Sequence, residues 1–432
     1  MQKKQDNIGL VWFRNDLRVQ DNQVLHEAVM AHDSIIACYC FDPRHYDLTA
    51  YGFKKTEKYR AQFLIETIED LKIKLKNLHI ELFVFNEKPE IELPKLVENF
   101  KITSIYLQKE WTTEEVDVFE KVKLAVSDEI IFKSYYDQFL YHPEDIPMSF
   151  DKIPKVYTAF RKKVEKYCDI RPSEENKTAQ PIENISNTTE IPSLEDLGLD
   201  TFEKHPESAF PFNGGETSAL DRLDHYFFET KKLGSYKKTR NGLIGTDYSS
   251  KFSAWLANGS ISARTIYWKV KDFEEEYFSN DSTYWLIFEL IWRDFFKYVS
   301  LKHDNAIFKI GGILDKDYDW KTSEREVKKW INGETRSDFV NANMIEFKET
   351  GFMSNRGRQN VASFFAKDML LDWRIGAAYF ESVLVDYDVH SNYGNWMYLA
   401  GVGNDPRDRK FNVDSQADRY DENGTFRELW LQ

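Results

Sequence analysis

The stretch from residue 351 to residue 405 limits the fold of this chain more than any other. Its sequence, GFMSNRGRQNVASFFAKDMLLDWRIGAAYFESVLVDYDVHSNYGNWMYLAGVGND, has the apolar spacing that is typical of buried helices. Polar and charged residues interrupt this pattern, namely Asn355, Arg358, Asp386, Asp388 and Asn392. An unpaired buried polar group costs roughly 1–3 kcal/mol, so a cluster of this density requires a partner. A large polar cofactor bound between helices is the simplest one.

The composition narrows the class of protein. The 432 residues allow about two to four domains, and a hydrophobic content of 42% supports large cores. Cys38, Cys40 and Cys168 form no disulfide framework, which favours a reduced, cytoplasmic setting. Without a signal-peptide pattern or an apolar run of about 18 residues, we expect neither secretion nor a membrane span. The net charge of −14 argues against non-specific coating of nucleic acid but allows one local basic groove.

The first 140 residues alternate between strand and helix. Helical periodicity is clearest over 54–78, and short β-rich apolar runs are expected as strands at 8–13, 34–41, 80–85, 104–107 and 129–132. This rhythm predicts βαβ units and a mostly parallel sheet. No G-x-G-x-x-G follows the first run, so the dinucleotide fingerprint is absent. The loop FRNDLRVQDN that does follow it is either a ligand site or, more usually, a solvated loop.

The chain changes character after this region. Residues 169–213 are acidic, interrupted by proline and poor in periodic apolar residues, which is typical of a long connector. From residue 214 onward the helical period dominates. We therefore predict an α/β domain over 1–140, an interdomain connector over 141–213 and a mostly helical domain over 214–432.

A basic segment opens the helical half. Residues 231–251 contain six Lys or Arg against one Asp, and the segment ends in TDYSSKFS before an apolar helical run. Free backbone N–H groups at a helix start form an anion site together with hydroxyls, here those of Thr246, Ser249, Ser250 and Ser253. An ordinary helix cap is the alternative, and the basic surroundings favour the anion site.

Glu289 and Arg293 stand four residues apart in the apolar run 281–299, so they lie on one helical face. Their flanks are too apolar for a surface ion pair, which makes Glu289 a candidate for a raised pKa or a specific hydrogen bond. Trp330, Trp373 and Trp396, taken singly, are expected to pack in the core.

The motifs SNRGRQN and DYDVHSNYGNW, with WFRNDLRVQDN near the start, resemble the photolyase/cryptochrome family and most closely its DASH branch. The resemblance covers nearly the whole chain apart from 169–213. It implies an α/β plus all-α fold, in which a Rossmann-like parallel-sheet domain precedes a mostly helical FAD-binding domain. WFRNDLRVQDN would chiefly brace the α/β domain.

The resemblance implies a deoxyribodipyrimidine photo-lyase type of enzyme. It would act as a monomer and repair cyclobutane pyrimidine dimers under blue light by electron transfer from FAD, preferentially in single-stranded DNA. The alternative is a cryptochrome photoreceptor that binds FAD and signals without efficient repair. A light-independent flavin or nucleotide-binding protein would leave SNRGRQN unexplained.

The resemblance also implies the FAD-binding residues. The flavin diphosphate would be lined by Tyr236, Ser249, Ser250, Lys251, Phe252 and Ser253. Arg358 and Asp386 would form an ion pair beside the flavin ring, with Arg293 supporting the site. Asp388 would accept from flavin donors, and Asn392 would face N5, where a neutral amide favours a repair-type redox cycle.

Catalysis would depend on Glu289, which holds the dimer base, and on an electron relay. The relay would run from flavin-proximal Trp396 through Trp373 to a surface-near Trp330.

The residues expected at the substrate are Asn355, Gln359, Tyr398 and Trp292. Gln359 and Tyr398 match the DASH pattern, where duplex-active photolyases carry Met and Trp. A smaller, more polar pocket gains less than the roughly 1–3 kcal/mol of stacking per base, while flipping a lesion out of duplex DNA costs a few kcal/mol. Single-stranded DNA is therefore the expected substrate. Its phosphates would contact Arg240, Arg356 and Arg409, with Lys237, Lys238 and Lys410 nearby.

The segment QKEWTTEEVD, 108–117, resembles the one that holds an antenna, 5,10-methenyltetrahydrofolate, with Glu110 as its anchor. A Glu at a strand-to-helix junction is equally well explained as a cap or dipole partner.

One loop departs from the family pattern. Where relatives carry Gly, Pro, Asp and Arg within 333–345, this chain has Arg336, Asp338, Asn341 and Ile345. The loss of Gly and Pro changes the backbone angles that the turn can adopt, and the loss of Asp and Arg removes the ion pair that the family pattern implies. This loop borders the lesion pocket in relatives, so the change bears on repair more than on FAD binding.

Overall fold

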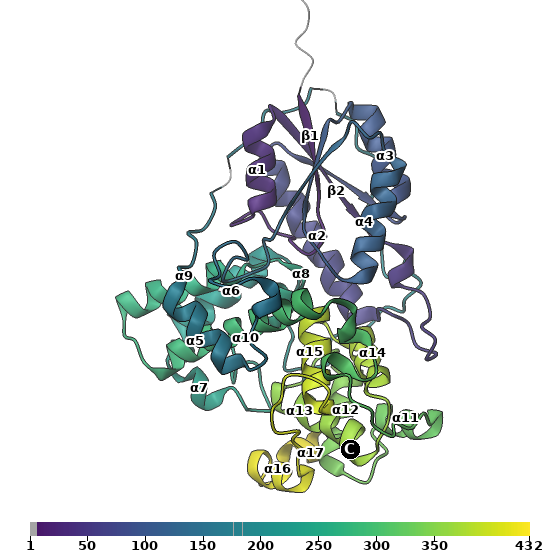
Figure 1. Cartoon of the computed structure of the whole chain (residues 1–432), viewed down its shortest axis with the longest axis vertical. Coiled ribbons are helices and arrows are strands. Elements are labelled where there is room, and N and C mark those ends of the chain that lie inside the picture. The colour runs from purple at the N-terminus through teal and green to yellow at the C-terminus, as the bar shows by residue number, and fades with distance from the viewer. Residues whose placement is uncertain (1–6, 176, 184) are drawn as a thin grey trace, which may run out of the picture.

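A five-stranded parallel sheet forms the centre of the N-terminal body in the computed structural model, which describes residues 7–175, 177–183 and 185–432 (Figure 1). The strand order is β3-β2-β1-β4-β5. The strands are β1 (Ile8–Trp12), β2 (Ser34–Cys40), β3 (Glu81–Phe85), β4 (Ser104–Gln108) and β5 (Ile131–Tyr135). The predicted strands and their parallel pairing are confirmed, although the last strand lies two residues later than expected.

Helices cover both faces of this sheet, as the alternation of buried residues along each strand requires. Val11 and Ala37 pack in one core with α1 (Gln23–Ala31) and α2 (Lys58–Asn77). Leu10 and Cys38 point to the opposite core, with α3 (Pro89–Phe100) and α4 (Thr113–Ala125). The three cysteines are free.

The segment between the two bodies differs from the predicted connector. Residues 141–168 include α5 (Tyr157–Tyr167), whose Phe160 packs on Phe295 in the helical body. This part is not a linker, because the apolar stripe of α5 finds a partner surface only in the helical core. Further along, Leu194, Leu197 and Leu199 are buried against the α/β body.

Helices make up the C-terminal body, and the mostly helical domain is confirmed. Its longest member is α10 (Asp281–His303), which packs against α5, α7, α9 and α15. The other helices are α6 (Glu216–Asp224), α7 (Tyr236–Thr239), α8 (Ser253–Asn258), α9 (Ala263–Glu276), α11 (Glu324–Ile331), α12 (Asp338–Thr350), α13 (Asn355–Ser363), α14 (Trp373–Val383), α15 (Val389–Ala400), α16 (Val413–Tyr420) and α17 (Thr425–Trp430). Within the described residues, no helix is both long and apolar enough to span a bilayer.

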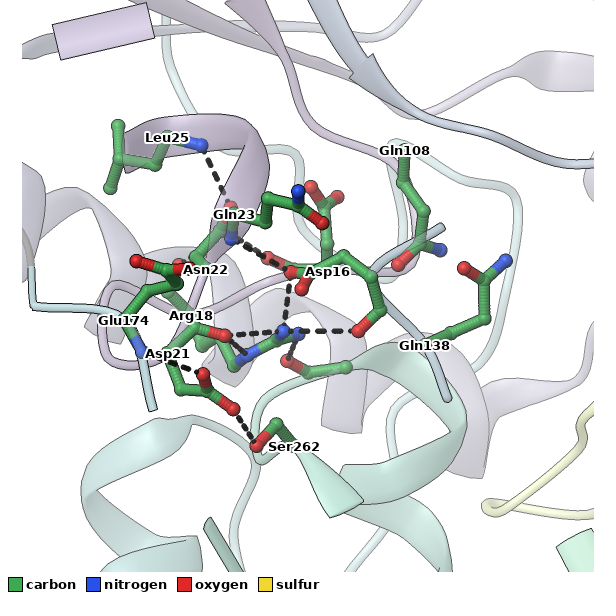
Figure 2. A network of polar contacts seen from close by, with 12 residues as sticks. Asp16, Arg18, Asp21, Asn22, Gln23, Leu25, Gln108, Gln138, Glu174 and Ser262 are labelled. Carbon is green, nitrogen blue, oxygen red and sulfur yellow. Dashed lines mark hydrogen bonds and ion pairs between the residues drawn. The ribbon is translucent and has the colours of Figure 1, made fainter. Parts of the chain in front are cut away.

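A buried polar network joins the two bodies (Figure 2). Arg18, in the loop after β1, pairs with Asp137 at 2.5 Å and donates to the carbonyl of Gly259 in the helical body. Asp21 accepts from Arg264 of α9 at 2.8 Å and from the hydroxyl of Ser262. The loop FRNDLRVQDN is therefore mostly buried and not solvated. Its charged residues connect the α/β domain to the helical domain, so its role is not limited to stabilising the α/β domain.

Candidate functional site

Two adjoining cavities of about 270 and 110 Å³ lie in the helical body and share five lining residues: Asn355, Arg358, Asp386, Asp388 and Ser391. Every residue predicted to bind the cofactor lines one or both of them: Tyr236, Ser249, Ser250, Lys251, Phe252, Ser253, Arg293, Arg358, Asp386, Asp388 and Asn392. Segments far apart in sequence thus converge on one site, which we call the FAD cavity.

Arg222 holds the serine-rich loop at one side of this cavity. Its side chain is 2% exposed, pairs with Asp247 at 2.7 Å and donates to the carbonyls of Thr246, Ser249 and Ser250. The helix after the loop, α8, has only six residues, and no side chain caps its first turn. The ordinary helix-cap alternative is therefore not observed. Sequence reasoning missed Arg222, since nothing in α6 distinguishes it from a surface arginine.

Several buried polar atoms at this site lack a hydrogen-bond partner in the chain. Lys251 is 3% exposed, its ammonium has no acceptor, and it lies 3.3 Å from the centroid of the Tyr248 ring. Burial holds the pKa of Lys251 well below its usual value and raises the pKa of nearby Glu346 to about 8. Trp396 Nε1 and Asp386 Oδ1 are also unpaired. Buried polar groups require partners, so a ligand with both anionic and hydrogen-bonding groups fits this cavity.

The ion pair predicted between Arg358 and Asp386 is present, with 2.9 Å between Nη2 and Oδ2. Arg358 also donates from Nε to the carbonyl of Met353. These contacts fix the guanidinium and leave the other oxygen of Asp386 for a ligand.

The start of α15 places three predicted residues on one helical stripe. Asp388 caps the helix by accepting from the backbone N–H of Ser391 at 2.7 Å. Asn392 and Trp396 follow at spacings of four and line the smaller cavity with it. Asn392 donates from Nδ2 to the carbonyl of Ala377 at 3.0 Å, which leaves its amide oxygen as the acceptor for a ligand.

Glu289 lines the larger cavity, and its ion-pair partner is Arg240, the residue directly after α7, at 2.9 Å. Arg293, one turn further along α10, instead donates to the carbonyls of Gln138 and Leu256. Burial raises the pKa of Glu289, and Arg240 counteracts this shift. Arg240, predicted at a DNA phosphate, is therefore tied to Glu289 because α7 packs directly on α10.

The predicted substrate residues divide into two groups. Asn355 and Gln359 line the cavities, whereas Trp292 and Tyr398 lie beside each other outside the lining, with ring centroids 6.1 Å apart. Trp292 is also stacked on Tyr157 at 3.7 Å.

Four of the remaining basic residues already have partners within the chain. Arg356 contacts Gln359 at 2.9 Å, and Arg409 contacts both Tyr398 and Asp405. Lys237 pairs with Asp281 and Lys410 with Asp368.

Trp330 is not near the surface, contrary to our prediction. It is fully buried, donates to the carbonyl of Val361 and lies 6.2 Å from Trp396, measured between ring centroids. The reason is that α11 buries its apolar face in the same core as Trp373 and Trp396.

Trp320, which sequence reasoning missed, is only half-buried. The backbone of the next residue, Lys321, exchanges hydrogen bonds with Leu370 and Asp372, beside Trp373. The one feature of the sequence that could have indicated a solvent-accessible tryptophan is its position directly after the polar stretch DKDYD.

A third cavity, of about 430 Å³, lies between the two bodies, and we call it the interdomain cavity. Glu110 lines it after β4, accepts from Gln108 at 2.7 Å and has a pKa raised by burial. Unpaired buried atoms there include Gln108 Oε1, Gln138 Oε1 and His390 Nε2; Figure 2 shows Gln108 and Gln138 together. The cavity is thus suited to a ligand with several hydrogen-bond donors.

The divergent loop is held by hydrogen bonds and an ion pair within the chain. Thr335 and Asn341 hydrogen-bond to each other through both side chains and backbone, and Arg336 pairs with Asp368. These contacts hold the segment although it lacks the Asp and Arg of the family pattern. No residue of 333–345 lines the FAD cavity as described, because the segment turns directly into α12.

Family models match both bodies: "DNA photolyase" covers residues 9–181 and "FAD binding domain of DNA photolyase" covers residues 285–432. A cryptochrome DASH of Xenopus laevis is 48% identical over 97% of this chain and 81% of its own length. The corresponding protein of Synechocystis sp. is 45% identical over 98% of this chain and 87% of its own length. The chain belongs to the photolyase/cryptochrome family, in its DASH branch.

Solved structures of family members agree with this assignment. A Synechocystis cryptochrome superposes with a TM-score of 0.94 at 45% identity, over 98% of this chain and 88% of that one. A Sulfolobus tokodaii photolyase, described as holding two FAD molecules with a novel light-harvesting cofactor implied, gives 0.78 at 26% identity over 98% and 90%. The helical body is thus the FAD-binding domain of this family, and the polar cavity with its unpaired ammonium fits that cofactor.

Proposed function

We propose that the protein is a blue-light-dependent photolyase that repairs cyclobutane pyrimidine dimers, preferentially in single-stranded DNA. The observation that supports this most directly is the position of Glu289. It is a carboxylate paired with Arg240 on the wall of the FAD cavity, close to Asn355.

The residues of the chain divide the work of binding and catalysis. Reduced FAD, when bound, supplies an electron after absorbing blue light and takes it back once the cyclobutane ring has split. Lys251 and the serines of 249–253 would hold the diphosphate, and Asp386, Asp388 and Asn392 would orient the flavin. Glu289, whose pKa is raised by burial, would donate a hydrogen bond from its protonated carboxyl to the dimer base and so stabilise the negative charge that develops there.

The preference for single strands follows from the polarity of the substrate side. Gln359 presents an amide at the cavity and is itself held by Arg356. An amide stacks less well on a flipped base than a large apolar side chain does. The pocket would therefore not offset the few kcal/mol needed to flip a dimer out of a duplex.

The test is blue-light repair of a thymine dimer in matched single-stranded and duplex oligonucleotides by the reduced, FAD-loaded protein. We expect repair in the single strand and little in the duplex. Equal repair of both would contradict the strand preference, and no repair of either by protein with photoreducible FAD would contradict the repair function.

One observation favours the photoreceptor as a second candidate. Arg240, Arg356 and Arg409 are engaged within the chain, so DNA phosphates would have to displace existing contacts. Absence of repair in the experiment above would support a protein that binds FAD and signals.

We further propose that the interdomain cavity holds the antenna, with 5,10-methenyltetrahydrofolate as the occupant and Glu110 as its anchor. The unpaired oxygens of Gln108 and Gln138 would accept from the pterin ring. A second flavin is the competing occupant, since the Sulfolobus tokodaii photolyase is described with two FAD molecules. Release and chromatographic separation of the bound chromophores distinguishes the two.

Replacing Trp320 by phenylalanine is expected to slow photoreduction of oxidised FAD by about tenfold or more. The half-buried indole would be the exit of the relay through Trp396 and Trp373, and phenylalanine is much harder to oxidise. Transient absorption after a blue flash measures the rate. The matched control is Trp268→Phe, since Trp268 is exposed on α9. An unchanged rate in Trp320→Phe together with loss in Trp330→Phe would restore our original assignment.

A further inference from the structure

Lys297 is a buried lysine that none of the roles above uses. It lies on α10, four residues after Arg293, and its side chain is 4% exposed. Its ammonium lies 2.9 Å from Asp388 Oδ2. Lys297 lines the interdomain cavity but neither part of the FAD cavity, whereas Asp388 lines all three. Asp388 thus separates the FAD cavity from the interdomain cavity. Lys297 contacts it from the side of the interdomain cavity.

Asp388 is held at both of its carboxylate oxygens. Oδ1 accepts from the backbone N–H of Ser391, which starts α15, and Oδ2 accepts from Lys297. The same helix carries Asn392 and Trp396 on the stripe that faces FAD. A change at Asp388 would therefore alter both its own contact with the flavin and the start of the helix that orients these two residues.

From this geometry we propose that Lys297 is a positioning residue, which acts on the FAD site through the carboxylate of Asp388. The proposal rests on FAD binding, which family membership supports, and is independent of whether the protein repairs DNA. It predicts that loss of Lys297 affects FAD through the charge state of Asp388 and not merely through packing.

The electrostatic surroundings of Asp388 support this. The groups that face it are Lys297 and Arg293 on α10 and His390 on its own helix, with Glu110 acting on Lys297 from the segment after β4. Burial by itself would raise the pKa of Asp388, but the cations outweigh burial, and Lys297 contributes most, so the pKa lies well below its usual range. Burial keeps His390 neutral.

These charges determine how the FAD affinity of a variant without Lys297 should change with pH. Without Lys297, burial still opposes ionisation while the main counter-charge is gone, so the pKa of Asp388 rises. As pH falls through that raised pKa, Asp388 becomes neutral and its bond to the Ser391 N–H loses its charge-assisted strength. FAD affinity should then weaken with falling pH in the variant, whereas in the native protein Asp388 stays ionised throughout.

The experiment measures the dissociation constant of FAD for the apoprotein, by flavin fluorescence, between about pH 5.5 and pH 8.5. In Lys297→Met we expect FAD binding about tenfold weaker at the acid end than at the alkaline end. The native protein and Lys297→Arg should vary by less than about twofold. Lys302→Met is the matched control, because Lys302 lies on the same helix, donates to the carbonyl of Ile153 and lines none of these cavities.

The double variant Lys297→Met/Asp388→Asn covers the case in which the single variant does not fold. It leaves no unpaired buried charge and keeps an acceptor for Ser391, so it should fold and bind FAD with an affinity that does not change with pH. Uniformly weaker binding at every pH in Lys297→Met would show a packing role only and overturn the proposal. So would pH-dependent binding in the double variant.

Discussion

Replacing Glu289 by alanine is expected to abolish most repair while FAD stays bound. The carboxyl group lies on the cavity wall 2.9 Å from Arg240, and its removal deletes the hydrogen-bond donor proposed to stabilise the dimer as the electron arrives. Loss of one such group lowers a rate by about 10- to 100-fold. FAD is retained because its proposed contacts are made by other residues, among them Lys251 and Arg358.

Repair per absorbed photon is the quantity to measure, with FAD content determined in the same samples. Glu275→Ala on α9 is the matched control, since Glu275 is exposed. Glu289→Gln keeps a hydrogen-bond donor, although an amide N–H is a weaker donor than a carboxyl O–H, so it should fall between the native protein and the alanine variant. Unchanged repair per photon in Glu289→Ala would remove this residue from the mechanism.

Replacing Arg264 by methionine is expected to produce the largest loss of stability. The side chains of Asp21 and Asp137 are 1% and 0% exposed, and Arg264 pairs with both. Removing one partner from a buried ionic network costs about 3–5 kcal/mol, because the remaining charge has lost its compensation. Arg18 still pairs with Asp137, so most of the loss should come from Asp21.

Urea denaturation measures this loss as an apparent free energy of unfolding. Lys269→Met on the same helix is the control, because the ion pair of Lys269 with Asp272 is exposed and surface pairs contribute about 1 kcal/mol or less. Arg264→Met/Asp21→Asn should recover part of the stability by removing the uncompensated charge. A loss no larger than that of the control would mean that the network does not hold the two bodies together.

Much of the fold and of the FAD site could be predicted from local patterns. The alternation of β-rich runs with helical periodicity predicted the parallel sheet. Both patterns reflect how often a side chain along the element turns toward the core. Spacing alone placed Glu289 and Arg293 on one helical face. The ion pair between Arg358 and Asp386 was implied by the family resemblance, and the structure contains it.

Contacts between distant segments could not be predicted in this way. Glu289 and Arg293 share a helical face, yet Glu289 pairs with Arg240 at the end of another helix. Taken singly, Trp330 was expected in the core, whereas the resemblance placed it near the surface; the packing of α11 buries it. Lys297 was overlooked although it continues the four-residue spacing of Glu289 and Arg293, because its partner, Asp388, lies 91 residues away.

The sequence by itself determined which segments are strands and helices and that a polar cofactor lies among the C-terminal helices. These properties depend on the spacing at which side chains along a strand or helix are buried and on the free-energy cost of burying an unpaired charge. Both can be judged from a short stretch of sequence. The tertiary structure alone decided which charged residues pair with each other. These pairs are Arg240 with Glu289, Arg264 with Asp21, and Lys297 with Asp388. Such pairs form where two elements cross, and the crossing depends on the packing of the whole chain.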